Sequence, residues 1–244
     1  MKKSTCDKSP FGDSIVEIGR LFIGKPYQSG TLENPGKEKL IINISAFDCT
    51  TFVETVLALA RCATEDRFSP DAFKKNIKSI RYRGGKINGY SSRLHYFTDW
   101  LNESEKKKIL INISRRLGGK LQRKKINFMT AHKKSYPALE NKKQLAEMGT
   151  VEQNLSSRTF HLIAKNKVSA IKEKIKNGDI IAFTTNQHGL DIAHVGFTVR
   201  QGSNLHLLHA SQKEGNVVIS KKTLVAYLKS NKKFSGIIVA RPSF

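Results

Sequence analysis

Residues 178–211 read GDIIAFTTNQHGLDIAHVGFTVRQGSNLHLLHAS, and this stretch determines the fold class that we expect for the chain. Its apolar residues fall into three short runs, 178–185, 190–199 and 204–211, which polar segments separate. Short apolar runs bounded by Gly, Asn and Ser are typical of β-strands joined by turns. Two further strand-like runs, GNVVIS and SGIIVARP, follow with a short helix between them. The sequence therefore predicts an antiparallel sheet from residue 178 onward.

Helical spacing of apolar residues precedes these strands. It predicts four helices, one beginning beside Asp48 and the others over residues 11–24, 70–83 and 90–101. Two strands joined at Gly118-Gly119 are expected within residues 107–130. Helices first and antiparallel strands after them are typical of an α+β fold and not of a parallel doubly wound one.

The domain organisation follows from length and from one interruption of the strand pattern. Residues 131–175 are polar and read as mostly helical or irregular, so we expect an insertion or cap there. A chain of 244 residues is long enough to bury a core within one domain. We therefore expect a single domain over residues 1–244.

The chain is strongly basic. It has 43 Lys and Arg against 20 Asp and Glu, a formal net charge of +23, which suggests a polyanionic partner or an acidic surface. The basic residues are spread along the chain, without zinc-finger spacing, an RNP-type strand or a clear recognition helix. We therefore expect no specific nucleic-acid partner. No apolar run approaches the roughly 20 residues that cross a bilayer, so no transmembrane segment is expected.

Three cysteines, Cys6, Cys49 and Cys62, make an odd count without CxxC metal spacing, so at least one thiol is free. Cys49 lies in or next to the first turn of the helix that begins beside Asp48. Unpaired N–H groups and the dipole at a helix N-terminus lower the pKa of a thiol and favour a thiolate nucleophile. Cys49 is therefore the candidate nucleophile. The alternative, a small buried apolar residue, suits Cys62 better.

Two histidines are candidates for the base that activates this thiol. A two-residue turn at Gln201-Gly202 places His194 directly opposite His209 on neighbouring strands, and opposed residues project from the same face. One imidazole can then act as base while the other orients it. Asp191 is a rival orienting group, and a register slip of one residue would put the two histidines on opposite faces.

Six motifs occur in a fixed order: PYQSGTLE, FDCTTFVE, YSSRLHYFTDW, INFMTAH, GDIIAF and LDIAHVGF. The run GKPYQSGTLE followed by FDCTTFVE resembles the GxPYxxG…DC signature of the NlpC-type, papain-like cell-wall peptidases. The whole set is similar to the branch described as N-acetylmuramoyl-L-alanine amidase-like, over about residues 11–240. The resemblance implies a papain-like NlpC-type fold, in which N-terminal helices pack on a central antiparallel sheet or half-barrel.

The resemblance also implies roles for four residues. Cys49 is the nucleophile, His194 the general base and His209 the third, orienting residue. Tyr27 matches the active-site tyrosine, which is expected to hydrogen-bond near the nucleophile or a substrate carbonyl. The alternative for Tyr27 is an ordinary loop aromatic.

A further motif of the branch contains Arg93, Tyr96 and Asp99, and the resemblance implies that these residues bind substrate. An arginine can hold a peptide carboxylate in a bidentate manner that an amine cannot reproduce. The alternative is structural, because residues at this spacing can pack and salt-bridge a helix against the sheet.

The activity implied is that of a cysteine amidase. It would hydrolyse the amide between N-acetylmuramic acid, expected in its 1,6-anhydro form, and L-Ala of peptidoglycan-derived muropeptides. No organic cofactor is implied, and no metal is expected because HExxH or His/Cys ligand spacing is lacking. Muropeptides are the expected partners of a monomeric enzyme.

Two alternatives stay open. One is a γ-D-glutamyl-diamino acid endopeptidase acting on muropeptides, since the choice of bond depends on pocket shape. The other is a non-catalytic basic module that binds cell-wall polymer or nucleic acid. The substrate class suggests the periplasm or cell envelope, although the opening MKKSTCDKSPFGDSIVEI lacks the apolar run of an export signal.

Overall fold

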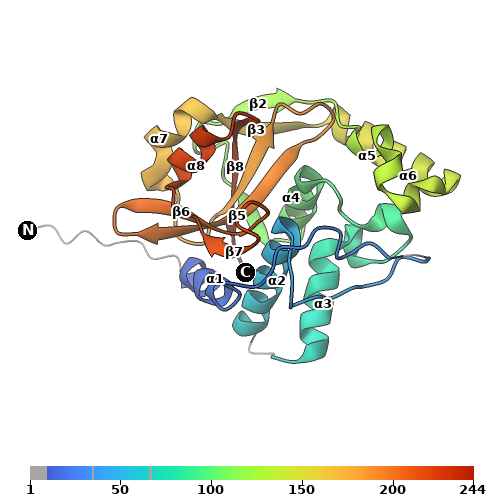
Figure 1. Ribbon diagram of the computed structural model, residues 1–244, viewed down its shortest axis with the longest axis horizontal. Coiled ribbons are helices and arrows are strands. Elements are labelled where there is room, and N and C mark those ends of the chain that lie inside the picture. Colours follow the sequence, from blue (N-terminus) through green and yellow to red (C-terminus); the bar gives the residue numbers. More distant parts are fainter. Residues whose placement is uncertain (1–9, 35, 66–67) are drawn as a thin grey trace, which may run out of the picture.

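The computed structural model describes residues 10–34, 36–65 and 68–244, and its helices surround one antiparallel sheet (Figure 1). The predicted α+β class is confirmed. The α-helices of the described ranges are α1 (Pro10–Arg20), α2 (Cys49–Thr64), α3 (Pro70–Arg81), α4 (Phe97–Lys106), α5 (Phe128–Ala131), α6 (Lys142–Ser157), α7 (Val168–Ile171) and α8 (Leu224–Ser230). The strands are β1 (Leu110–Asn112), β2 (Lys120–Arg123), β3 (Thr159–Ala164), β4 (Ile180–Thr185), β5 (Ile192–Gln201), β6 (Asn204–Ser211), β7 (Asn216–Ile219) and β8 (Phe234–Pro242).

The sheet has the strand order β2-β3-β8-β4-β5-β6-β7, and β1 pairs with β8 outside this path. Every strand pair is antiparallel. The elements predicted from residue 178 onward are confirmed as β4 to β8, with α8 between the last two strands. Because β4 to β7 follow one another in sequence and in space, they form a meander that sets β5 beside β6.

The two strands predicted within residues 107–130 are confirmed as β1 and β2, but they do not pair with each other. The first, β1, pairs with β8, and the second, β2, pairs with β3. Ser114 fixes the chain after β1 to the sheet, because its hydroxyl oxygen accepts a hydrogen bond of 2.8 Å from the N–H of Val239. The turn signal at Gly118-Gly119 is local and carries no information about partners so distant in sequence.

Residues 131–175 are less uniformly helical than predicted. They contain α6, α7 and several short 3₁₀ turns, but β3 is a strand of the central sheet and pairs with both β2 and β8. The helical part has an apolar cluster of its own, in which Leu139, Met148 and Leu155 pack with Tyr96. A cap formed by this helical part, within a single domain, stays a prediction.

Apolar clusters cover both faces of the sheet. On one face Phe52 of α2 packs against Phe197 of β5, with ring centroids 6.0 Å apart. On the other face Leu224 and Leu228 of α8 pack against Leu207 of β6. Burying one such side chain stabilises the fold by about 1.5–3 kcal/mol. These contacts hold α2 and α8 on either side of the β5–β6 pair.

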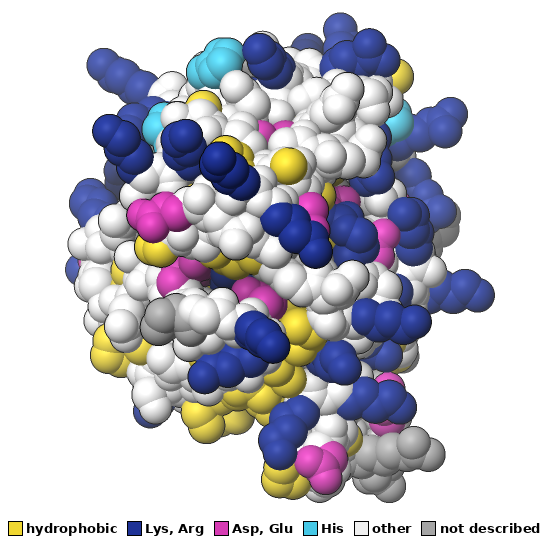
Figure 2. Space-filling view, turned by 90° about the vertical axis from the view of Figure 1, so that its right-hand side faces the viewer, with side chains coloured by type: hydrophobic (Ala, Val, Ile, Leu, Met, Phe, Trp, Pro, Cys, Tyr) yellow, Lys and Arg dark blue, Asp and Glu magenta, His cyan; other side chains and the backbone are white. Residues whose placement is uncertain are grey.

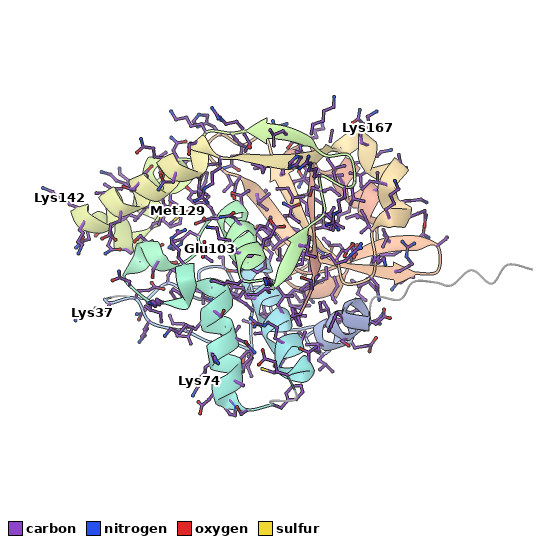
Figure 3. The ribbon with its side chains drawn as sticks, turned by 180° about the vertical axis from the view of Figure 1, so that it is seen from behind. Lys37, Lys74, Glu103, Met129, Lys142 and Lys167 are labelled. Atoms are coloured by element: carbon purple, nitrogen blue, oxygen red, sulfur yellow. The ribbon has the colours of Figure 1, made fainter. Side chains whose placement is uncertain are left out.

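Positive side chains are spread over the surface, in agreement with their spread along the sequence. Figure 2 shows Lys and Arg across one whole face of the molecule, with fewer Asp and Glu among them. Lys37, Lys74, Lys142 and Lys167 project from well-separated parts of the chain (Figure 3). Within the described ranges, no helix combines the length and the apolar character needed to cross a bilayer.

Candidate active site

Cys49 is the first residue of α2. The preceding residue, Asp48, caps this helix: its carboxylate accepts a hydrogen bond from the Thr51 N–H at 2.7 Å. In return the Thr51 hydroxyl oxygen accepts one from the Asp48 N–H at 3.0 Å. Such a reciprocal cap fixes the residue at which a helix begins. The predicted position of Cys49 at a helix N-terminus is therefore confirmed.

Cys49 is half-buried, and its thiol is packed among protein atoms. It forms hydrogen bonds with the backbone of Val195 and the side chain of Thr50. Burial, followed by the negative charge of Asp48, nevertheless raises the pKa of Cys49 to about 12. The lowered pKa expected from the helix N-terminus is not found, because burial outweighs that effect. The thiol is protonated at neutral pH and needs a base before it can attack.

His194 on β5 and His209 on β6 contact each other directly, with 2.7 Å between Nε2 of His194 and Nδ1 of His209. Burial lowers the pKa of His209 to about 4. Burial, together with the charge of His209, lowers the pKa of His194 well below its ordinary value. Both imidazoles are therefore neutral at pH 7. One hydrogen lies between Nε2 of His194 and Nδ1 of His209, so the tautomer of one ring determines that of the other. Nδ1 of His194 remains available for proton transfer.

The register of the β5–β6 hairpin differs from the predicted one by two residues. Its turn begins one residue later, at Gly202, and Gln201 pairs with Asn204. Because side chains alternate with a period of two, an even shift keeps both histidines on one face, as diagonal neighbours instead of opposed residues. Close approach of the strands requires Gly196, since a Cβ there would lie 2.8 Å from the Cβ of His209.

A β-bulge lies immediately before His194. Between β4 and β5, Phe183 is the partner of His194 but the next residue, Thr184, is the partner of Ile192, so Ala193 is an extra residue. Bulges increase the local twist and redirect the neighbouring side chain. The ring of Phe183 stacks on the redirected imidazole with centroids 5.9 Å apart. Bulge and stacking together set the direction of His194.

Tyr27 lies close to Cys49. A backbone bridge to Phe47 and a 2.8 Å hydrogen bond from the Tyr27 N–H to the Gly215 carbonyl hold its loop in place. Burial, followed by the charges of Cys49 and Asp48, raises the pKa of Tyr27 to about 12. The phenol therefore keeps its proton at neutral pH and can donate a hydrogen bond beside the thiol.

Tyr227 of α8 also borders the site, and sequence reasoning missed it. Its ring centroid lies 5.4 Å from that of His209 and 6.2 Å from that of His194. Burial, followed by the charges of Cys49 and Glu214, raises the pKa of Tyr227 to about 12. The helix over residues 222–230 was readable from the sequence, but nothing in its local pattern placed it beside the histidines.

Asp191, the rival orienting group for His194, has another role in the structure. Its carboxylate accepts hydrogen bonds of 2.7 Å from both the N–H and the hydroxyl of Thr98. These bonds cap the first turn of α4, which begins at Phe97 and not at residue 90 as the sequence predicted. Burial raises the pKa of Asp191 despite these bonds. The orienting contact to His194 comes from His209.

Arg93 is buried and bonded within the protein. Its Nη2 donates a hydrogen bond of 2.8 Å to Glu33, and its Nε lies 3.3 Å from a carboxylate oxygen of Glu38. The guanidinium carbon lies 4.9 Å from the ring centroid of Tyr90. These ion pairs match the structural role that the sequence analysis gave as the alternative to substrate binding. Binding of a substrate carboxylate by Arg93 stays a prediction.

Tyr96 and Asp99 likewise have partners within the fold. The Tyr96 hydroxyl donates a hydrogen bond of 2.6 Å to Glu152. Asp99 forms ion pairs of 2.7 Å with Arg83 and 3.2 Å with Arg158. Both side chains are almost fully buried. They join α4 to the segments around it, and their roles toward substrate stay predictions.

The arrangement around Cys49 supplies the groups that nucleophilic acyl transfer needs: a thiol, a base, and a group that orients the base. Among the described residues, no group of three or more His, Cys, Asp or Glu side chains is placed to hold a metal ion. The α+β fold and this set of side chains are compatible with a hydrolase, in which nucleophilic attack by Cys49 stays a prediction.

The family is shown by sequence. The model of the N-acetylmuramoyl-L-alanine amidase-like (AmiA-like) family matches residues 17–237, and the chain belongs to this family. No curated protein sequence matches the chain. The family and its structural relatives support an amidase, and hence a hydrolase, function.

Solved structures resemble almost the whole chain. An N-acetylmuramoyl-L-alanine amidase from Bacteroides uniformis is 40% identical, with a TM-score of 0.91 over 96% of this chain and 99% of that one. A putative xylanase from Bacteroides fragilis is 42% identical, with a TM-score of 0.88 over 92% and 99% of the two chains. Protein LPG0564 from Legionella pneumophila, at 23% identity, shares the fold with a TM-score of 0.73 over 96% and 89%.

Alkylation tests the neutral thiol. At pH 7 iodoacetamide is expected to label Cys49 faster than Cys62, because Cys62 is only 1% exposed. The rate at Cys49 should rise from pH 7 to about pH 10, since a thiol with a raised pKa forms thiolate only in alkaline solution. Peptide mass spectrometry follows the two sites separately. A rate that has already levelled off near pH 6 would indicate a preformed thiolate–imidazolium pair instead.

Proposed function

We propose that this protein is a cysteine amidase that hydrolyses the amide between N-acetylmuramic acid and L-Ala in peptidoglycan-derived muropeptides, with the 1,6-anhydro sugar as its preferred form. The observation that carries the proposal is the 2.7 Å contact between His194 and His209 on the strand pair next to the Cys49 thiol. The Bacteroides uniformis relative is named for the same amide bond. A cysteine helix packed on an antiparallel sheet supports placement in the NlpC-type, papain-like superfamily.

In the first half of the reaction, Nδ1 of His194 takes the proton of the Cys49 thiol as the sulfur attacks the lactyl carbonyl carbon. The oxyanion that forms accepts hydrogen bonds from the N–H groups of Cys49 and Thr50 at the start of α2, because the Thr51 N–H is donated to Asp48. His194 then gives its proton to the nitrogen of L-Ala. The C–N bond breaks, the peptide leaves as a free amine, and a thioester remains on Cys49.

In the second half, His194 takes a proton from water, and the hydroxide equivalent attacks the thioester. Collapse of this intermediate returns the thiol and releases the lactyl carboxylate. His209 holds the tautomer of His194 that presents Nδ1 to the thiol, so it acts as a positioning residue. The neutral state of both imidazoles fits a base that must accept a proton at pH 7.

Tyr27 donates its phenolic hydrogen beside the thiol in this scheme, to the substrate carbonyl or to the sulfur as charge develops. We further propose one catalytic domain acting as a monomer, without a metal or organic cofactor. The periplasm or cell envelope is the compartment that the substrate class suggests.

The experiment is mass spectrometry of purified muropeptides, with reducing and 1,6-anhydro ends, incubated with the protein and with Cys49→Ala. The expected products are free peptides that begin with L-Ala, together with the bare amino sugar. Products in which L-Ala-D-Glu stays on the sugar would assign the γ-D-glutamyl endopeptidase activity instead. No cleavage of any muropeptide would favour a non-catalytic basic binding module.

A further inference from the structure

A cavity of about 610 Å³ lies beside the histidine pair. His209 and Tyr227 form part of its wall, and the rest comes from the segments that surround β7 and α8. Tyr227 is close enough to Cys49 for the thiol to affect its pKa. A ligand in this cavity can therefore be continuous with a substrate bound at the thiol.

The cavity is lined by lysines that lack counter-ions. These lysines are Lys213, Lys221, Lys222, Lys232 and Lys233, and all of them are exposed. One acidic residue, Glu214, shares the lining. None of the five lysines has an ion-pair partner within the part of the chain that the structure describes. The buried arginines Arg81 and Arg93, in contrast, are paired with glutamates.

Such a set of unpaired like charges disfavours the folded state through repulsion, and it attracts anions. A concave site lined by one sign of charge concentrates the field of its residues and raises the local concentration of oppositely charged ligands. The occupant that fits this cavity is therefore an anion that reaches His209 and Tyr227 at one end.

The reaction itself indicates which part of the substrate lies there. The leaving nitrogen must come within hydrogen-bond reach of His194 to receive its proton. The peptide that carries this nitrogen therefore extends on the histidine side of the scissile bond, where His209 borders the cavity. A γ-linked D-Glu and a following diamino acid carry free carboxylates on this leaving peptide, whereas the amino sugar is uncharged.

We propose that the lysine-lined cavity is the subsite for the leaving peptide and binds its carboxylates, which makes the enzyme selective for muropeptides with free carboxyl groups. This inference rests on the proposed amidase function. The lysines act on substrate binding and not on the chemical step, so their removal raises KM and leaves kcat nearly unchanged.

The test compares two charge-reversed variants, Lys221→Glu/Lys222→Glu and Lys232→Glu/Lys233→Glu, with the control Lys142→Glu/Lys143→Glu on α6. Each double variant changes the net charge equally, and the control lysines are exposed and absent from the cavity lining. Two substrates are used, a 1,6-anhydro-N-acetylmuramoyl tripeptide with free D-Glu and diamino-acid carboxyls and the same molecule with both carboxyls amidated. Binding of the two corresponding free tripeptides to the Cys49→Ala protein is measured by calorimetry.

The cavity variants are expected to lose about tenfold or more in kcat/KM on the free-carboxyl substrate, mainly through KM, and little on the amidated one. The control should match the unaltered protein on both substrates, and the difference should fade in about 0.5 M salt. Equal losses on both substrates, or none, would overturn the inference while leaving the amidase function intact. Failure of the unaltered protein to cleave either substrate would overturn the amidase function. The binding of the free tripeptides then tests the cavity separately, and equal affinity for the free and the amidated tripeptide would overturn the proposed subsite.

Discussion

Replacement of Cys49 by Ala is expected to lower kcat for muropeptide amide hydrolysis by at least about 10⁴-fold. In the proposed mechanism the substitution removes the sulfur that forms the acyl bond, and neither His194 nor water replaces it. Substrate binding should persist, since the walls of the site are intact. The rate is measured by chromatography of the released peptide under single-turnover conditions.

Cys62→Ala is the matched control, because Cys62 lies on the same helix but is buried away from solvent, where its sulfur accepts a hydrogen bond from Asn76. This variant should keep kcat within a few-fold of the unaltered protein and lose only stability. Both variants are compared by circular dichroism, so that a folding defect is recognised. Full activity in Cys49→Ala would remove the thiol from the mechanism.

The second large effect concerns stability. Glu54 of α2 and Arg81 of α3 form an ion pair of 2.7 Å whose side chains are 2% and 4% exposed. The Arg81 guanidinium also donates to the carbonyl of Ile41, in the loop that leads to Asp48. Glu54→Ala leaves the arginine charge buried without its partner, and we expect a loss of about 3–5 kcal/mol in the free energy of unfolding. Urea unfolding followed by circular dichroism measures it.

Lys74→Ala provides the contrast, because Lys74 and Asp71 form an exposed pair on α3. Its free energy of unfolding should not change measurably, as for most surface ion pairs. A double variant, Glu54→Leu/Arg81→Met, is expected to recover much of the loss, since an apolar pair leaves no buried charge. If Glu54→Ala unfolds at the same urea concentration as the unaltered protein, the ion pair does not stabilise the helix that carries Cys49.

The sequence predicted correctly those features that depend on neighbouring residues. The helix expected to begin beside Asp48 put Cys49 at the start of α2, and the structure shows that a cap between Asp48 and Thr51, only three residues apart, fixes this start. Short apolar runs bounded by turn residues located β4 to β8. The alternation of side chains along a strand kept His194 and His209 on one face although the turn was misplaced, because an error of two residues preserves the face of a strand.

Features that depend on residues distant in sequence could not be predicted from local patterns. Arg93 binds Glu33, which lies 60 residues away in the sequence, and no local pattern indicates a partner at that distance. The pairing of β1 with β8 and the position of Tyr227 beside the histidines have the same origin, since both depend on how complete elements pack.

The protonation state of the Cys49 thiol also depends on residues that are distant in sequence. A helix N-terminus favours the thiolate, and this effect is local and readable from the sequence. Desolvation depends on every atom packed around the sulfur, and in the folded chain it raises the pKa of Cys49. Residue types and their order thus identified the candidate nucleophile and base, whereas long-range packing set their charges, their partners and the lysine-lined cavity beside them, because burial and contact arise only when separate segments fold together.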